Sequence, residues 1–312
     1  MSNSFTPAYL QLPPGELEKR AEQALELLKA CVLCPRRCRV NRWEVANGVC
    51  RTGRYARVSS YGPHMGEEDV LRGWRGSGTI FFSRCNLRCQ FCQNYEISQQ
   101  EAGDEVDAGE LAEIMLRLQA YGCHNINLVS PTHVVAQILE AVAIAARRGL
   151  RLPLVYNTGG YDSLLALRLL DGVIDIYMPD MKYADERIAF TYSLVRNYPR
   201  VNQAAVKEMH RQVGDLQIGE DGLARRGLLV RHLVLPNHLA GTRKIVRFLA
   251  RHISPNTYLN IMAQYHPDYR AERYPLINRR ITAEEYEAAI RAAKEAGLYR
   301  LDQQQRMIFH WS

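Results

Sequence analysis

Short apolar runs alternate with longer amphipathic stretches from residue 78 to residue 296. The apolar runs, each of which predicts a strand, are residues 78–83, 125–129, 152–156, 174–177, 228–235 and 258–263. Apolar residues recur at helical spacing near residues 110–121, 134–147, 162–170, 185–196, 202–213, 243–252 and 283–296. Repeated strand-then-helix order predicts parallel βα units. Six units are too few for an eight-stranded barrel, so the pattern predicts an open doubly wound sheet or a partial barrel, with ligands at the C-terminal ends of the strands.

The first 77 residues have a different pattern of apolar and polar positions. Apolar positions at helical spacing predict a helix over residues 16–30, directly after Gly15. From Cys31 to Gly78, frequent glycines and the lack of a long period predict short strands and turns. We therefore expect two parts: residues 1–77, a helix with a cysteine-rich segment, and residues 78–312, the βα units.

Composition narrows the class of protein. Apolar residues make up 47% of the chain and charged residues 23%, which excludes a disordered or fibrous chain. No apolar run approaches the roughly 18 residues of a membrane span, and the first thirty residues lack an apolar signal core. We therefore expect a cytoplasmic protein without a membrane partner. In a reducing compartment, cysteines that cluster as tightly as seven of these eight predict metal binding rather than disulfides.

Three of these cysteines follow the first predicted strand. Cys85, Cys89 and Cys92 have the spacing C-x3-C-x2-C. Three thiolates from one loop can bind three irons of a [4Fe–4S] cube, whereas complete ligation takes four cysteines, so one iron is left for an external ligand. The alternatives to a cluster are a zinc site or thiols that only pack in the core. The position at a strand end favours the cluster.

At these residues the chain resembles the radical S-adenosylmethionine (SAM) superfamily. The hallmark of that superfamily is C-x3-C-x-aromatic-C, and Phe91 fills the aromatic position. The resemblance implies that the open iron chelates SAM, and that one electron from the cluster cleaves SAM to methionine and a 5′-deoxyadenosyl radical. That radical abstracts hydrogen from a substrate. The resemblance also implies a partial (β/α)6 barrel, in agreement with the six predicted units.

Four strand ends resemble the pyruvate formate-lyase activating enzymes, and an uncharacterised group named after them. The similar segments are Asn-Thr-Gly-Gly-Tyr at 157–161, Met-Pro-Asp-Met-Lys at 178–182, Arg-His-Leu-Val-Leu-Pro at 231–236, and Tyr-His at 265–266. The resemblance implies SAM-site roles for Lys182, Arg231 and His266. It implies a monovalent cation site at Thr158, Met178 and Asp180. Lysine and arginine suit the SAM carboxylate because they give charge-assisted hydrogen bonds, and a carboxylate oxygen suits a simple cation.

Two positions depart from the activase pattern. The activases carry Gly-Gly-Glu after the second strand, where the glutamate takes the SAM amino group. Here Ser130 and Thr132 occupy that region, and their hydroxyls are the candidates for the same hydrogen bond. The first aspartate of the cation site is Asn157 here, which removes one negative charge.

A second group of cysteines lies in the N-terminal part. Cys31, Cys34, Cys38 and Cys50 have the spacing C-x2-C-x3-C-x11-C, which can close a zinc site or a second iron–sulfur cluster. Residues 31–57 contain seven arginines against one acidic residue, Glu44, a local net charge of +6. Arginines that offset the charge of a metal–thiolate site explain this excess. The alternative explanation of the arginine excess is a binding surface for nucleic acid or an acidic protein.

Taken together, these features predict a radical SAM oxidoreductase of the activating-enzyme type. Its substrate is a glycine of a protein partner, as for the activases, or a small molecule or RNA, and its electron donor is a protein such as flavodoxin or ferredoxin. The competing hypothesis is a metal-bound, nucleic-acid-binding module that uses the arginine-rich segment. We also expect residues 254–276 either to close the barrel mouth or to form an ordinary surface loop, and residues 306–311 to pack against the barrel.

Overall fold

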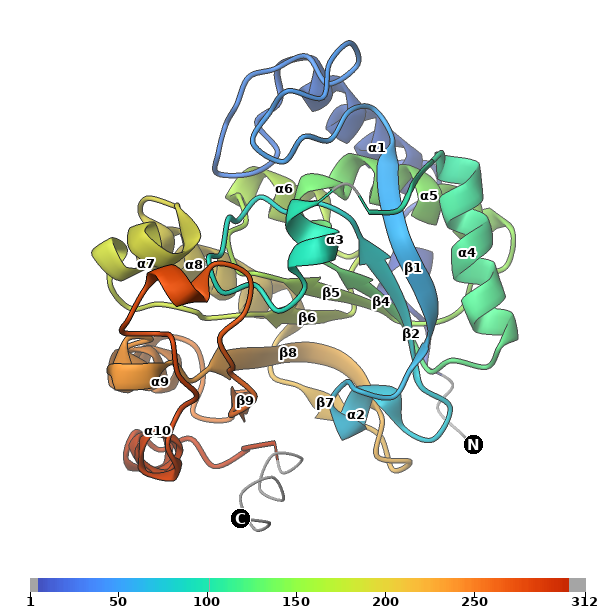
Figure 1. Ribbon diagram of the computed structural model, residues 1–312. Coiled ribbons are helices and arrows are strands. Elements are labelled where there is room, and N and C mark those ends of the chain that lie inside the picture. The colour runs from blue at the N-terminus through green and yellow to red at the C-terminus, as the bar shows by residue number, and fades with distance from the viewer. Residues whose placement is uncertain (1–4, 101, 303–312) are drawn as a thin grey trace.

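A computed structural model describes residues 5–100 and 102–302, and its centre is one curved β-sheet (Figure 1). Its strands are β1 (Ala56–His64), β2 (Ser77–Phe82), β3 (Asp104–Val106), β4 (Ile126–Val129), β5 (Leu154–Thr158), β6 (Ile176–Pro179), β7 (Gln217–Ile218), β8 (Ala224–Leu233) and β9 (Tyr258–Met262). The order across the sheet is β3-β1-β2-β4-β5-β6-β8-β7, and β9 pairs with β8. Neighbours among β2, β4, β5, β6, β8 and β9 are all parallel. These six strands are the six predicted ones, and they confirm the partial (β/α)6 barrel.

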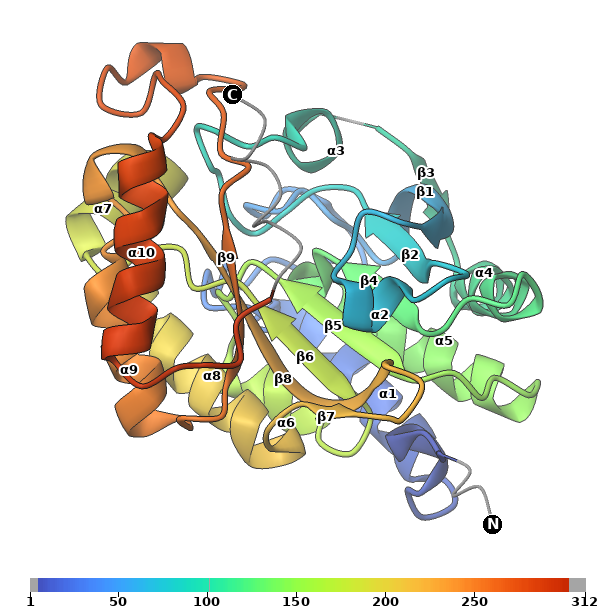
Figure 2. The ribbon, with the colours of Figure 1, turned by 90° about the horizontal axis from the view of Figure 1, so that it is seen from below.

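The α-helices surround this sheet: most cover its outer face, whereas α2 packs against the apolar cluster of its inner face (Figure 2). They are α1 (Glu16–Glu26), α2 (Asp69–Arg72), α3 (Tyr95–Gln99), α4 (Ala108–Ala120), α5 (Val135–Arg147), α6 (Leu164–Leu169), α7 (Glu186–Ser193), α8 (Tyr198–Val213), α9 (Thr242–His252) and α10 (Ala283–Glu295). Several begin where a side chain caps the first turn. Asp107 with Glu110, and Thr282 with Glu285, form reciprocal capping boxes on α4 and α10.

The inner face of the barrel has two layers. Val155, Ile176 and Leu229 point inward at the N-terminal ends of their strands, where they pack with Leu71 of α2 in a buried apolar cluster. Two residues further along β5 and β8 stand Asn157 and Arg231, on the same face because side chains alternate along a strand. The sheet therefore presents its polar groups at the C-terminal ends of the strands, above an apolar floor.

The N-terminal segment is tied to the barrel rather than set apart from it. Helix α1 packs against α5, and the carboxylate of Asp175 accepts hydrogen bonds from the backbone amides of Ala8 and Leu154, both shorter than 3 Å. Strand β1 pairs antiparallel with β2 and extends the barrel sheet. The division into residues 1–77 and 78–312 stays a prediction, because β1 and α2 share the sheet and the core of the second part.

Strand β1 was expected only as one of several short strands. Its nine residues include Ser59, Ser60 and Pro63, and its outer half is largely exposed, so it lacks the apolar alternation by which strands are recognised. Pro63 lies beyond the three-residue pairing with β3, where its missing N–H leaves no ladder bond broken.

Two further expectations concern the chain ends and membranes. The packing predicted for residues 306–311 lies outside the described residues. In the described ranges, 5–100 and 102–302, no helix has the length and apolarity needed to cross a bilayer.

Candidate active site at the C-terminal ends of the strands

The loop after β2 brings together the three cysteines of the second group. Arg84, whose φ is 73°, turns the chain sharply before Cys85. The three thiols are close enough that Cys85 and Cys89 each interact electrostatically with Cys92. Burial and these neighbouring thiols raise the pKa of Cys85 to about 12. Burial also raises the pKa of Cys89, to about 11, although nearby Lys182 opposes the shift.

Small polar groups line the same thiols. The Leu87 amide donates to Cys85 Sγ at 3.4 Å, while Ser193 Oγ lies 3.0 Å from Cys89 Sγ and Ser98 Oγ lies 3.1 Å from Cys92 Sγ. Hydrogen bonds to sulfur tune an iron–sulfur cluster, and a coordinated thiol loses its proton whatever its pKa in the free protein. Three thiols carried by one loop, each with a small polar neighbour, are therefore the candidate protein ligands of a cluster with one open iron.

A C-terminal loop covers this cysteine loop. The ring of Phe91 packs edge-on against Tyr265 at 5.6 Å, and Tyr95 stacks on Tyr269 at 5.2 Å. The Arg270 amide donates to the Gln90 carbonyl at 2.9 Å. The structure thus shows that residues 265–270 lie over the cysteine loop, as the expected closure of the barrel mouth requires.

His266 lies in this covering loop. Its Nδ1 is 2.8 Å from the side-chain nitrogen of Gln93, next to Cys92. The predicted His266 is therefore close to the cysteine loop, while within the described residues it forms no hydrogen bond with Lys182 or Arg231.

A buried charge network occupies the ends of β5, β6 and β8. Asp180 accepts from Lys182 Nζ at 2.6 Å and from Arg231 Nε at 3.0 Å, and Arg231 Nη2 donates to Asn157 Oδ1 at 2.7 Å. Burial alone would raise the pKa of Asp180, but the two cations outweigh it and the pKa is lowered. Burial likewise opposes the charge on Lys182, yet Asp180 and Cys89 raise its pKa. All four predicted residues are thus in contact, and Lys182 links them to the cysteine loop.

Three residues that sequence reasoning missed hold this network in place. The Tyr198 hydroxyl donates to the carbonyls of Gly159 at 2.8 Å and Asp180 at 3.1 Å, and it accepts from the Lys182 amide at 3.1 Å. Asn202 donates to the carbonyls of Gly160 and Asp180, both at 2.9 Å. At Gly160, with φ 75°, an added Cβ would lie 2.1 Å from the Asp180 carbonyl oxygen. Only the two glycines after Thr158 signalled this close approach.

Other predicted residues are engaged elsewhere. Thr132 Oγ1 donates to Asp162 at 2.7 Å and lies 2.9 Å from the Thr158 hydroxyl, which donates to the same carboxylate. Met178 lies in the apolar cluster of the barrel floor. The side chains of Thr158, Met178 and Asp180 therefore do not converge on one point. Ser130 follows β4 in a left-handed conformation, with φ 61°.

Two acidic residues enter the barrel from the segment before α2. Glu67 Oε2 is 4.0 Å from Arg231 Nη1, and Asn260 on β9 donates to Glu68 Oε1 at 2.7 Å. Burial raises the pKa of Glu68. No motif marked these glutamates, because they precede the barrel strands and reach it only through the packing of α2.

The first group of cysteines surrounds one small cavity. Cys31, Cys34, Cys38 and Cys50 all line this cavity of about 10 Å³. Burial, followed by the charges of the other three thiols, raises the pKa of Cys34 to about 12. Buried Arg42 directs Nη1 at Cys31 Sγ at 3.8 Å, so a cation does lie beside these thiols. Among the described residues, no three Cys, His, Asp or Glu side chains converge tightly enough to hold one metal ion.

Two arginines connect the cysteine groups. Arg88, between Cys85 and Cys89 in sequence, donates to the Val49 carbonyl and interacts electrostatically with both Cys85 and Cys50. Arg36, between Cys34 and Cys38, donates through Nε to the Asn86 carbonyl at 2.9 Å. The two loops are therefore neighbours in space although about fifty residues separate them.

Comparison with known proteins agrees with this site. Residues 79–223 match the model of the radical SAM superfamily, and this match includes β2 and the three cysteines that follow it. Residues 79–223 of the chain therefore form a radical SAM superfamily domain. Members of this superfamily cleave SAM to a radical at a [4Fe–4S] cluster and need an electron donor for that step.

One relative extends the match across nearly the whole chain. The uncharacterized protein MJ0674 of Methanocaldococcus jannaschii is 34% identical over 295 residues, which cover 91% of this chain and 80% of that protein. Since that relative is itself uncharacterized, it adds no substrate. The activase-like branch stays a prediction.

Solved structures are similar to this chain at low sequence identity. The FeFe-hydrogenase maturase HydG from Carboxydothermus hydrogenoformans superposes with a TM-score of 0.50 and 11% identity, over 70% of this chain and 50% of that one. A radical SAM methyltransferase from Sphaerobacter thermophilus gives a TM-score of 0.47 and 15% identity, over 70% and 64%. This chain thus spans less than two thirds of the length of either structure.

Proposed function

We propose that the chain abstracts hydrogen from its substrate with a 5′-deoxyadenosyl radical, and that Cys85, Cys89 and Cys92 hold the [4Fe–4S] cluster. When bound, the cluster and SAM supply reductive cleavage and the radical. The observation that carries this proposal is the junction at the strand ends. There the three thiols meet the Asp180–Lys182–Arg231 network, with Lys182 beside Cys89.

In this proposal, Lys182 and Arg231 orient the SAM carboxylate. Lys182 has three N–H donors and Arg231 five, so each keeps donors to spare after its bond to Asp180. Asp180 fixes the direction of both cations and offsets their charge in a buried setting. Asn157, as a neutral amide, holds Arg231 without adding the second negative charge that the activases carry there.

The remaining predicted residues take narrower roles. We assign His266 to the cover over the cysteine loop, and Phe91 to the contact between that loop and its cover; together they exclude water from the radical. Ser130 is our candidate for the SAM amino group, since Thr132 is buried with its hydroxyl against Asp162 and Thr158. For a monovalent cation, Asp180 is the remaining candidate, because the Thr158 hydroxyl bonds to Asp162 and Met178 lies in the apolar floor.

We also propose a second metal site at Cys31, Cys34, Cys38 and Cys50. Four thiols on one cavity suit zinc or an iron–sulfur cluster. The nearby arginines, including buried Arg42, offset the charge of a metal–thiolate centre.

The test combines metal analysis with turnover. The protein, purified without oxygen, is compared with a Cys85/Cys89/Cys92→Ala triple variant. Cys123→Ala is the matched control, because Cys123 is buried and belongs to neither group. Iron, zinc and sulfide are counted, and methionine and 5′-deoxyadenosine are measured with dithionite as reductant.

Each outcome is distinct. About eight irons in the wild type and about four in the triple variant mean two clusters. About four irons and one zinc, with only the iron lost, mean a structural zinc site beside one cluster. Wild-type protein without iron after reconstitution, or without SAM cleavage, contradicts the proposal. Nucleic-acid binding that weakens with salt would then favour the competing hypothesis.

A further inference from the structure

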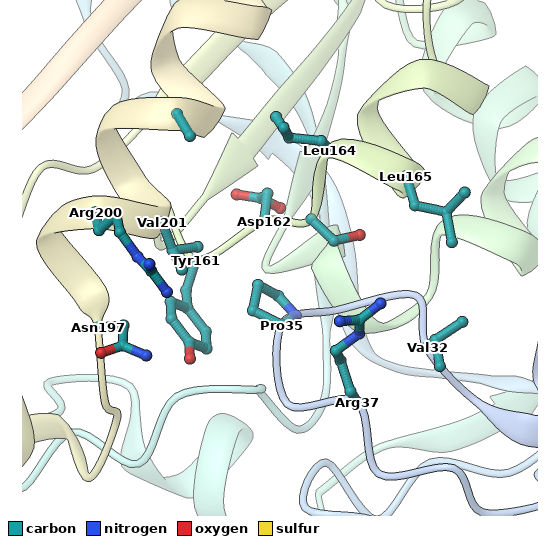
Figure 3. Close-up of a pocket in the computed structure, with 12 residues that line it drawn as sticks. Val32, Pro35, Arg37, Tyr161, Asp162, Leu164, Leu165, Asn197, Arg200 and Val201 are labelled. Atoms are coloured by element: carbon teal, nitrogen blue, oxygen red, sulfur yellow. The ribbon is translucent and has the colours of Figure 1, made fainter.

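A groove lies between the cysteine-rich segment and the outside of the barrel (Figure 3). Its volume is about 520 Å³, and it is separate from the site at the strand ends. Val32, Pro35 and Arg37 form one wall, Leu164 and Leu165 of α6 form another, and Arg200 of α8 closes it. We call these six residues the arginine groove.

The charge of the arginine groove is not neutralised within the chain. In the part of the chain that the structure describes, neither guanidinium, that of Arg37 or that of Arg200, has a hydrogen-bond or ion-pair partner. Figure 3 shows the two arginines on opposite sides of Tyr161 and Pro35. Asp162 also lines the groove, but its carboxylate is buried and bonded to threonine hydroxyls. The groove therefore presents positive charge to a partner.

Exposed apolar side chains continue from the groove. Leu164 and Leu165 are 39% and 40% exposed, and Phe190 and Leu194 are 49% and 41% exposed. A second hollow of about 480 Å³, which includes Phe190 and Arg196, shares Asn197 with the groove. Exposed large apolar residues interleaved with arginines are typical of protein interfaces, whereas nucleic-acid surfaces are dominated by charge.

The position of the groove indicates what docks there. Val32, Pro35 and Arg37 alternate with the cysteines of the first group. Arg36, in the same loop, donates to Asn86 in the cysteine loop of the active site and, at 2.7 Å, to the Leu194 carbonyl beside the exposed apolar residues. A protein seated on the groove would contact a loop that adjoins both groups of thiols. A redox partner needs that position.

We propose that the arginine groove docks an acidic one-electron-donor protein of the flavodoxin or ferredoxin class. The inference rests on the proposed function, which requires such an electron. The donor loses one electron and the cluster gains it, so no bond is made or broken and no proton moves. Acidic residues on the donor complement Arg37 and Arg200, and its apolar contact surface covers Leu164 and Leu165.

The experiment compares two reductants on the intact, cluster-loaded protein. SAM cleavage is driven by flavodoxin hydroquinone in one series and by dithionite in the other. The test variant is Arg37→Glu/Arg200→Glu. The control, Arg247→Glu/Arg251→Glu, reverses the same number of charges on exposed arginines of α9. Binding of flavodoxin is also titrated directly, with an RNA oligonucleotide as a competing polyanion.

We expect the test variant alone to raise the KM for flavodoxin by about tenfold and to weaken the salt dependence, with dithionite-driven cleavage unchanged. Equal losses with both reductants, no change in either, or equal effects of the control would overturn the inference. Binding of RNA but not flavodoxin would also overturn it. Failure of dithionite-driven cleavage in the wild type would count against the proposed function, while the binding titration still decides the docking surface.

Discussion

The hydroxyl of Tyr198 forms hydrogen bonds with the backbone that follows two neighbouring strands, β5 and β6. It shares one proton between the carbonyls of Gly159 and Asp180 and accepts from the amide of Lys182, and the side chain is fully buried. Tyr198→Phe keeps the ring and removes these bonds. Asn202 still reaches the Asp180 carbonyl, so the chief loss is one buried amide left without an acceptor. Such a loss costs about 2 kcal/mol of unfolding free energy.

The functional consequence is expected at SAM rather than at the cluster. The lost bonds hold the backbone on which Asp180 and Lys182 stand, while the three cysteines lie on another loop. We expect Tyr198→Phe to keep its iron and to bind SAM about tenfold more weakly, as positional errors of this kind commonly cost. Urea unfolding, iron content and equilibrium dialysis with SAM measure these effects separately.

Tyr161→Phe is the matched control for this variant. Tyr161 stacks on Tyr198 with ring centres 6.0 Å apart, and its hydroxyl donates to the Arg196 carbonyl at the rim. It should lose less than about 1 kcal/mol and keep its affinity for SAM. If the two variants are indistinguishable, or if Tyr198→Phe loses iron together with SAM affinity, the assigned role of the hydroxyl is wrong.

Three further predictions test other parts of the site. Burial lowers the pKa of His232 to about 4, so the neutral ring must be charged on unfolding below its ordinary pKa, and the fold loses stability as the pH falls toward 4. His232→Gln should remove this loss, which amounts to about 3 kcal/mol of unfolding free energy, when unfolding is measured at several pH values. Gly160→Ala should cost about 3 kcal/mol or more in the same assay, because its Cβ would collide with the Asp180 carbonyl, whereas Gly149→Ala, with open space around it, should cost less. Arg88→Gln should make the cluster potential more negative by tens of millivolts in an EPR titration, since a positive charge beside Cys85 is removed; an unchanged potential would contradict that placement.

The barrel was predictable because its strands obey local rules. Each parallel strand is a short apolar run closed by a polar residue, and the polar residues Asn157, Asp180 and Arg231 stand at strand ends that parallel pairing brings together. The positions of Lys182 and the three cysteines follow from the same rule. The superfamily match over residues 79–223 agrees with the predicted fold, while the roles of these residues stay a prediction.

The parts that escaped prediction depend on contacts between distant segments. Glu67 and Glu68 reach the barrel only because α2 packs beneath it, and Tyr198 acts through backbone carbonyls that carry no sequence signal. Thr132 was a candidate for the SAM amino group, yet it is buried, with its hydroxyl 2.7 Å from Asp162 and 2.9 Å from Thr158. Local spacing cannot show which of two partners a hydroxyl will choose.

The cysteine-rich loop contacts residues that come much later in the sequence, and this delays its folding while the chain is being synthesised in the cell. Its contacts join Leu33 to Ser163 and Arg36 to Leu194, across 130 and 158 residues. A ribosome adds about 5 to 20 residues each second, so the four thiols of this loop emerge many seconds before their neighbours are made. Until then they are exposed and reactive. The nascent chain is therefore vulnerable to oxygen and stray metal ions at these four thiols until residues 163–194 have been made.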